Sequence, residues 1–394
     1  MSRLKRLHTV LTTRNSPCDI WLIAAAVALA GIGWVMVSSA SIGLLENSFY
    51  YFRQHGVFLL ISTLGCLFML SVPLEVWRQN AALIFLISVA LLVGVLLFGQ
   101  EINGSKRWIS LPGPLPSLQV SELGKIGLIF YMAMFMSRFT YDLRRRVFTM
   151  WRPIAVLALP AGLLFLAPDF GGMVVYTACV IGMLMMSGAS LVLLIGSGAV
   201  LGFGAVMMVA LEPYRLARWT SFLDPWADQF ATSYQLTQAL IAFGRGHVTG
   251  TGLGNSVQKL HYLPEAHTDF IFAVIAEELG MIGAIAIILL FTLLISRAMW
   301  IGRKAELAGH LFGAYVSYGI CFVIASQAFI NMAVSSGLLP TKGLTLPLIS
   351  YGGSSLLVIG MMIGLLLRVD AETRQRPSRA PTPYKPRHEP RLSK

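Results

Sequence analysis

Charged side chains are scarce in this sequence. Asp, Glu, Lys and Arg make up 12% of the 394 residues, whereas hydrophobic residues make up 56%. A soluble domain carries roughly 25% charged residues, so this chain lacks the charge needed to cover a folded surface in water. The composition excludes a soluble globular protein and a disordered one, and it favours a chain that lies in a lipid bilayer.

Cysteine is also scarce. The four cysteines, Cys18, Cys66, Cys179 and Cys321, each lie in or beside an apolar run. Their spacing matches neither a disulfide framework nor a zinc site. We therefore interpret all four as packing residues.

Ten apolar runs of near membrane-spanning length follow one another along the chain. They predict an all-α polytopic membrane protein of about ten transmembrane helices. The predicted spans cover residues 20–41, 57–73, 81–98, 118–137, 153–167, 170–187, 190–211, 269–296, 310–335 and 354–369.

The basic residues predict how the chain is oriented. The net charge is +12, but the bases lie beside apolar runs and form no patch with aromatics, so we expect no nucleic-acid binding. Most Lys and Arg fall on the side of the two termini, which the positive-inside rule places in the cytoplasm. We therefore predict a cytoplasmic segment (1–18), a membrane domain (19–369) and a disordered basic cytoplasmic tail (370–394). A large extracytoplasmic loop (212–268) lies between helices 7 and 8.

Two irregular segments interrupt the predicted helices. The short fifth and sixth spans meet at Pro168-Asp169-Phe170-Gly171-Gly172. Residues 337–355, between the last two spans, contain two prolines and several glycines, which are incompatible with a regular helix. Irregular backbone at membrane depth requires cover from protein or water, so we predict that residues 337–355 form a re-entrant loop that lines a cavity.

Four ionisable residues stand out inside the predicted spans, where charge is costly and often functional. Glu122 and Lys125 are three residues apart and share one helix face. They form either a structural ion pair or part of a substrate site. Glu277 and Glu278 have no neighbouring base in the sequence, so at least one needs a partner from another helix or stays protonated.

Asp269 opens the eighth span, directly after the long loop. The simplest interpretation is a helix N-cap, which Thr268 or Asp269 could supply. A carboxylate at the outer membrane boundary could instead accept a proton from a sugar hydroxyl. His267 either tunes that carboxylate or belongs to the turn.

Several bases lie on the predicted outer face. Lys and Arg side chains suit phosphate, and a departing pyrophosphate needs fixed positive charge. Each base alone is more often solvated or in contact with a lipid headgroup. Together they could form a pyrophosphate site from Lys106, Arg107, Arg215, Arg218, Arg245, Lys259 and Lys342.

Five stretches of this sequence resemble the SEDS family of shape, elongation, division and sporulation proteins, and its division branch more than its elongation branch. The resemblance covers residues 19–373, with one departure at Val120, where the family usually has proline. The stretches are 103–109 (NGSKRWI), 119–125 (QVSELGK), 168–172 (PDFGG), 262–280 (YLPEAHTDFIFAVIAEELG) and 339–355 (LPTKGLTLPLISYGGSS).

The resemblance implies a peptidoglycan glycosyltransferase that polymerises lipid II at the division septum and releases undecaprenyl pyrophosphate. It implies Asp269 as the catalytic base in an inverting transfer. We expect pyrophosphate contacts from Arg107, Lys342, Arg218 and Arg245, in that order. The remaining substrate-binding candidates are Glu122, Lys125, Ser354, Tyr351 and His267.

The resemblance also implies partners and a location. We expect a class B penicillin-binding protein of the FtsI-type transpeptidase kind, together with other divisome proteins, in the bacterial inner membrane. No cofactor is certain, although Mg²⁺ or Mn²⁺ could assist the transfer. Two other functions stay open, namely a lipid II flippase and a non-enzymatic scaffold that recruits the septal transpeptidase.

Overall fold

A computed structural model shows the protein as a bundle of apolar helices. The structure describes residues 18–42, 49–102, 105–109, 118–145, 151–189, 195–196, 198, 222–230, 233–341 and 343–375. Nearly all of the predicted N-terminal segment (1–18) and of the predicted seventh span (190–211) lies outside these residues. The predicted disordered tail (370–394) is wrong at its start, because the last helix continues through it to Gln375, and the rest of the tail lies outside the described residues. The division of the chain into segments and the outer position of loop 212–268 therefore stay predictions.

The described helices confirm the predicted all-α membrane architecture. Seven of them are long and apolar enough to span a bilayer, and α6 and α7 are shorter apolar helices, as expected for the fifth and sixth spans. The helices are α2 (Ile20–Ala40), α3 (Tyr50–Ser71), α4 (Leu74–Phe98), α5 (Val120–Arg145), α6 (Trp151–Leu166), α7 (Phe170–Met186), α10 (Tyr234–Gly246), α11 (Ile271–Leu307), α12 (Leu311–Ser335) and α13 (Gly353–Gln375).

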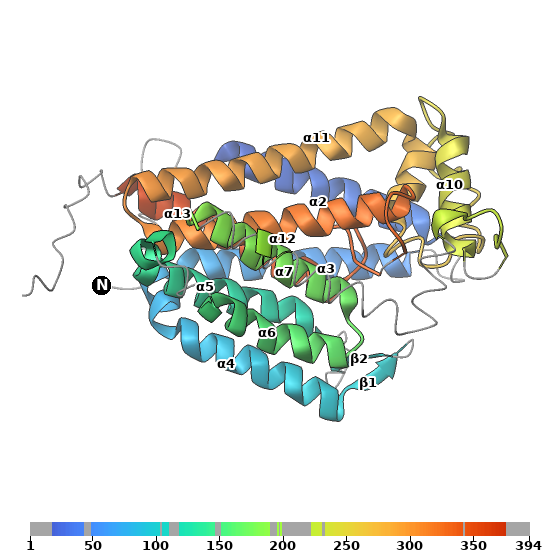
Figure 1. The fold of residues 1–394 in the computed structure, drawn as a ribbon. Helices are drawn as coiled ribbons and strands as arrows, with labels where there is room; N and C mark the ends of the chain where they lie inside the picture. Colours follow the sequence, from blue (N-terminus) through green and yellow to red (C-terminus); the bar gives the residue numbers. More distant parts are fainter. Residues whose placement is uncertain are drawn as a thin grey trace, which may run out of the picture.

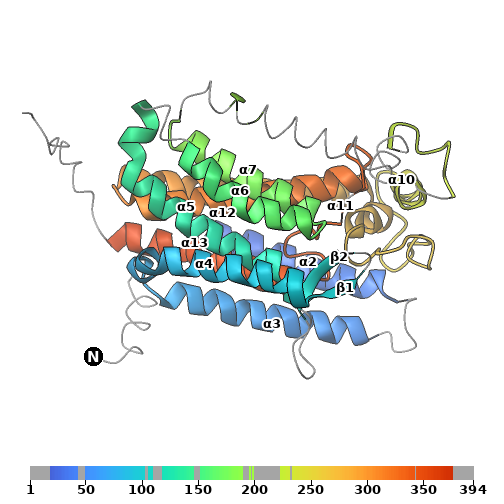
Figure 2. The same ribbon diagram turned by 60° about the horizontal axis from the view of Figure 1, so that its bottom comes forward.

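A small antiparallel sheet joins α4 to α5, and the sequence did not predict it. Its order is β1 (Gln100–Ile102), β2 (Ser105–Ile109) and β3 (Leu118–Gln119). Two views place the sheet and α10 at the same end of the bundle (Figures 1 and 2). We call this the outer end, because the predicted orientation places the segments around it outside the cell.

Burial differs strongly between helices. Most of α13, α12 and the span of α5 is buried, whereas α2, α3 and α4 are largely exposed. The exposed side chains on these peripheral helices include Leu60, Leu64, Leu86 and Leu97. Apolar residues face outward here because lipid, rather than water, is the expected surrounding. The core therefore lies around α12, α13 and α5.

Two features at the outer end shape the site. Helix α11 is kinked at Gly280, whose φ of 66° and ψ of −166° are open only to glycine. A Cβ at Gly280 would lie 2.3 Å from the backbone nitrogen of Gly250, so no side chain fits. The kink separates a short outer segment, Ile271–Leu279, from the rest of α11, and the outer loop packs against it.

The chain between α12 and α13 turns back into the bundle. Asn331 Nδ2 donates to Leu344 O at 2.5 Å, and Gln327 Nε2, one helical turn deeper, donates to Thr345 O at 3.2 Å. Gln327 lies eight residues before the end of α12 at Ser335, which is about 12 Å along a helix axis. The predicted re-entrant loop is confirmed in this sense.

Candidate functional site

Asp269 does not cap α11. The N-cap position is Phe270, which has no side-chain capping hydrogen bond. The Thr268 hydroxyl donates instead to the Glu265 carboxylate at 2.5 Å. No described residue donates a hydrogen bond to the Asp269 carboxylate, so the N-cap interpretation of Thr268 or Asp269 is wrong and the carboxylate is left for another role.

The surroundings of Asp269 suit a general base. The pKa of this carboxyl is raised from 3.8 to about 7, chiefly by burial and also by the nearby Glu265 carboxylate, while the Arg107 guanidinium lowers it. Desolvation and a like charge both disfavour the ionised form. A pKa near the working pH is favourable for general-base catalysis, because a substantial fraction is ionised yet still basic.

Arg107 reaches this site from β2. Its guanidinium donates to the carbonyl oxygens of Ala167, at 3.4 Å, and of Pro168. It also lies 3.9 Å from Asp169, the N-cap of α7. The turn between α6 and α7 therefore holds the Arg107 guanidinium, and 27% of its side chain stays exposed to meet a ligand.

The re-entrant segment holds the backbone around Asp269. Asn331 donates to Asp269 O at 2.9 Å, Ser350 Oγ donates to Thr268 O at 2.6 Å, and the Tyr351 amide donates to His267 O at 3.0 Å. A Cβ at Gly343 would lie only 2.8 Å from Asp269 Oδ2. Glycine at this position therefore lets the re-entrant segment approach the carboxylate closely.

Aromatic rings flank the site. The Tyr351 ring lies 5.6 Å from His267 and 5.1 Å from Tyr51 of α3, measured between centroids. Burial lowers the pKa of His267 and raises that of Tyr351, so both stay neutral at pH 7. His267 Nδ1 and both ring nitrogens of His55 are buried without a hydrogen-bond partner in the described part of the chain.

Glu122 and Lys125 form a buried ion pair below the site. Lys125 Nζ lies 2.6 Å from Glu122 Oε1 and 2.9 Å from Gln327 Oε1. Gln327 also donates to Thr345 of the re-entrant segment. The predicted ion pair between Glu122 and Lys125 is thus confirmed. A role of this pair in substrate binding stays a prediction.

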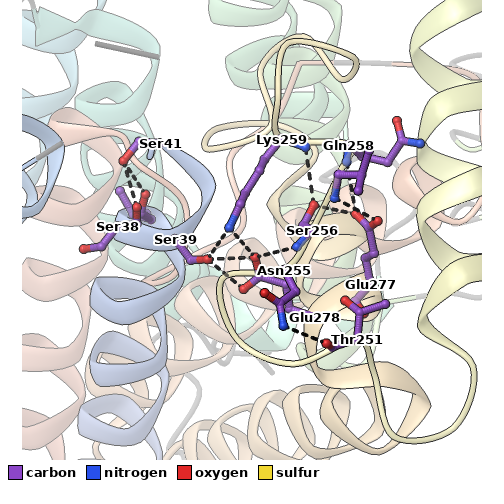
Figure 3. Close-up of polar contacts among 12 residues, drawn as sticks. Ser38, Ser39, Ser41, Thr251, Asn255, Ser256, Gln258, Lys259, Glu277 and Glu278 are labelled. Atoms are coloured by element: carbon purple, nitrogen blue, oxygen red, sulfur yellow. Dashed lines mark hydrogen bonds and ion pairs between the residues drawn. The ribbon is translucent and has the colours of Figure 1, made fainter. Parts of the chain in front are cut away.

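Glu277 and Glu278 find basic partners in the outer loop, namely Lys259 (Figure 3) and Arg245, which lies on helix α10. The prediction that at least one of them needs a partner from another helix is therefore confirmed. Lys259 Nζ lies 2.8 Å from Glu278 Oε1, and the hydroxyl of Ser39 on α2 donates to the same carboxylate at 2.7 Å. Glu277 accepts from Ser256 Oγ at 2.5 Å and lies 3.4 Å from Arg245 Nε of α10. Lys259 is fully buried in this cluster, so no free Lys259 ammonium faces solvent.

The structure gathers only part of the predicted site. Asp269, Arg107, His267 and Tyr351 lie together at the outer end. Ser354 begins α13 there and accepts from the Gln119 amide at 2.9 Å. Arg245 belongs to the separate Glu277 cluster, with 42% of its side chain exposed. Lys342 and Arg218 lie outside the described residues.

Three residues that organise the site were missed from the sequence. Asn331 and Gln327 are polar residues inside an apolar span, and that is a signal which sequence reasoning could have used. Glu265 lies four residues before Asp269, and a second carboxylate so close in the sequence is a signal for a shifted pKa.

The described residues contain no group of three or more His, Cys, Asp and Glu side chains that could hold a metal ion. Mg²⁺ is often bound by one or two carboxylates together with substrate phosphates, which the neighbouring Asp269 and Glu265 would fit. The divalent cation stays a prediction.

Comparisons with known proteins cover nearly the whole chain. The profile of the cell cycle protein family of FtsW, RodA and SpoVE matches residues 20–375. A protein of Halomonas elongata, named "Probable peptidoglycan glycosyltransferase FtsW", is 57% identical over 95% of this chain and 96% of its own length. A protein of Hahella chejuensis with the same name is 47% identical over 91% of this chain and 92% of its own length.

Solved structures share the fold. A chain from a peptidoglycan synthase complex, described as coordinating polymerization and crosslinking, superposes with a TM-score of 0.76 at 27% identity, over 91% of this chain and 99% of that one. The rod shape determining protein RodA of Thermus thermophilus superposes with a TM-score of 0.68 at 26% identity, over 91% of this chain and 97% of that one.

Proposed function

Since this chain belongs to the cell cycle protein family of FtsW, RodA and SpoVE and is a peptidoglycan glycosyltransferase, we propose that lipid II is its substrate and Asp269 its catalytic base. Lipid II carries a disaccharide pentapeptide on undecaprenyl pyrophosphate. The transfer joins these disaccharides into glycan strands. The observation that carries the proposal is the Asp269 carboxylate, which is not used for helix capping and has a pKa raised to about 7.

The chemistry needs one base and one positively charged surface. The 4-hydroxyl of the acceptor sugar attacks the anomeric carbon of the donor. The new C–O bond forms as the bond to pyrophosphate breaks, and Asp269 takes the hydroxyl proton. The α-linked donor becomes a β-1,4 product, so one inverting displacement suffices.

Arg107 is the described base best placed to stabilise the leaving pyrophosphate. It influences the pKa of Asp269 and part of its side chain is exposed. Fixed positive charge stabilises the transition state because negative charge develops on the departing oxygen. Lys342, Arg218 and Arg245 are further candidates for this role. Mg²⁺ or Mn²⁺ held by Asp269 and Glu265 would add positive charge at the same place.

His267, Tyr351 and Ser354 line the side of the site toward α3 and α13. Their neutral rings and hydroxyl suit a sugar rather than a phosphate. Glu122 and Lys125 support the re-entrant segment from below through Gln327. A direct contact between this pair and the substrate would require the pair to open.

The family supports a proposal for the partner and the location. We propose a class B penicillin-binding protein of the FtsI type as the partner, because a relative of known structure is part of a peptidoglycan synthase complex that also crosslinks. The site of action is the septum, together with other divisome proteins. The protein lies in the inner membrane of a bacterium, with both termini in the cytoplasm.

The decisive assay is glycan polymerisation from purified lipid II in detergent, with the transpeptidase present. We expect Asp269→Asn to abolish polymerisation. The purified variant should still bind the partner and should elute from a size-exclusion column at the same volume as the wild type. Near wild-type polymerisation by this variant would reject the assignment of the base. Detergent has no two sides, so a flippase would show no activity in this assay, and a scaffold would be indifferent to the variant.

The orientation can be tested by labelling single cysteines with an impermeant thiol reagent, after the four native cysteines are replaced. Leu253 of the outer loop and Leu307 at the end of α11 are 56% and 66% exposed. We expect Leu253→Cys to react in intact spheroplasts and Leu307→Cys only after the membrane is opened. The reverse pattern would invert the topology and remove Asp269 from the outer face.

A further inference from the structure

A groove between α4, α5 and α6 lies at the opposite end of the bundle from Asp269. Its volume is about 550 Å³, and its lining combines aromatic residues with the guanidinium groups of Arg138 and Arg152. We propose that this groove binds one anionic diacyl phospholipid of the cytoplasmic leaflet. The phosphate would lie between the two arginines and an acyl chain along the aromatic wall.

The depth of the residues supports this assignment. The apolar span of α5 runs from Val120 to Thr140, so Arg138 lies where the span ends. Arg152 is the second residue of α6 and follows Trp151, which is 59% exposed. Tryptophan is typical of the membrane interface. Both guanidinium groups therefore lie at the depth of lipid headgroups.

The aromatic wall extends from there toward the bilayer centre. The rings of Phe135 and Phe139 are tilted against each other with centroids 4.9 Å apart, and those of Phe85 and Tyr131 are paired at the same distance. Tyr131 lies seven residues before Arg138, which is about 10 Å deeper along a helix. This length fits the upper part of an acyl chain lying below a bound phosphate.

A kink in α5 lies in the wall of the groove. Helix α5 leaves helical geometry at Phe139, with φ of −114° and ψ of 20°. The Arg152 guanidinium lies over the Phe139 ring, 5.9 Å from its centroid, and 6.0 Å from the Trp151 ring. Ring faces hold an arginine without neutralising its charge. The guanidinium is thus fixed in place but still available to an anion.

The charge of the groove argues for an anionic ligand. Within the described residues, neither Arg138 nor Arg152 has an ion-pair partner, and the lining contains no carboxylate. By contrast, Arg78 and Arg303, on the same predicted side, pair with Glu75 and Glu306 at 2.9 Å. Basic pockets between helices on the cytoplasmic side are suited to anionic headgroups. An apolar partner helix would leave both charges without a counterion.

The test is native mass spectrometry of the delipidated full-length protein, titrated with phosphatidylglycerol or with phosphatidylcholine of identical chains. We expect a phosphatidylglycerol adduct at lower lipid concentration. The double variant Arg138→Gln/Arg152→Gln should weaken it about 25-fold, because each base near an anionic lipid contributes a factor of about five. Arg78→Gln/Arg303→Gln, which removes the same charge elsewhere, is the matched control and should bind as the wild type does.

A second variant tests the groove rather than the charge. Ala155→Trp fills the groove and leaves both arginines in place, so it should also weaken the adduct. Equal binding of both lipids, or an adduct that both the double variant and Ala155→Trp retain, would overturn the proposal. If undecaprenyl phosphate displaces phosphatidylglycerol at equal concentration, the groove binds a polyprenyl lipid and the assignment to a diacyl phospholipid is wrong. Displacement by millimolar inorganic phosphate would show a site for the anion alone and would equally refute a phospholipid site.

Discussion

Replacing Lys259 by methionine should strongly destabilise the outer end of the protein. Lys259 Nζ and Glu278 Oε1 are 2.8 Å apart, and their side chains are 2% and 0% exposed. At an effective dielectric constant of about 20, this distance corresponds to an attraction of about 6 kcal/mol. Much of it offsets the removal of both charges from water. Removing one partner alone strands the other charge and typically costs about 3–5 kcal/mol.

The damage should extend to catalysis, because only nine residues separate Lys259 from Asp269 along the chain. In Lys259→Met, the partners of the Glu278 carboxylate within the described part of the chain are the Ser39 hydroxyl and the Ser256 amide. The double variant Lys259→Met/Glu278→Gln removes the stranded charge. It should therefore recover much of the stability and part of the polymerisation rate.

The assay is the temperature of unfolding in detergent, followed by intrinsic fluorescence, together with polymerisation of lipid II. Arg303→Met is the matched control, because its ion pair with Glu306 lies on the same helix but is 59% exposed on the arginine side. Such a surface pair contributes less than about 1 kcal/mol. The reasoning is refuted if Lys259→Met unfolds at the same temperature as the wild type. It is equally refuted if the double variant unfolds at a lower temperature than Lys259→Met.

Two further predictions concern the site itself. The polymerisation rate should rise with pH around a midpoint of about 7, because Asp269 must be ionised to act as a base. Glu265→Gln should lower that midpoint, because it removes a negative charge that raises the pKa of Asp269. A pH–rate profile checks both statements, and a midpoint that Glu265→Gln leaves unchanged would contradict the second. Lys125→Met should cost about 3–5 kcal/mol by stranding Glu122 in the bundle, whereas exchanging the two charges should restore part of the expression measured in membranes. Additive damage from Glu122 and Lys125 variants would instead indicate separate roles.

The helices were predictable because each apolar span carries its own signal. Hydropathy predicted every described spanning helix, with ends displaced by at most eleven residues (296 against 307). The largest displacement is at the end of α11, which continues to Leu307. Such an extension is no longer apolar, so hydropathy cannot detect it. The small sheet between α4 and α5 was missed because its strands are short.

The site was less predictable, because its contacts join segments far apart in the sequence. Lys259 appeared to be one of several outer bases, and only the kink at Gly280 brings it against Glu278. Arg107 was predicted to contact pyrophosphate, but the turn after α6 that holds it could not be inferred from spacing. The sequence showed where each basic residue lies along the chain, but it did not show which residue that side chain contacts.

The conflict at Asp269 was between a helix cap and a catalytic base, and the surrounding hydrogen bonds explain why the second role is open. A residue at the start of a helix often uses its side chain to satisfy backbone groups. Here the backbone oxygens of Thr268 and Asp269 are satisfied by Ser350 and Asn331. The re-entrant segment and α12 thus fix this turn from outside. They leave the Asp269 carboxylate without a hydrogen-bond partner among the described residues and under the influence of the Arg107 guanidinium, so the role of catalytic base stays open to it.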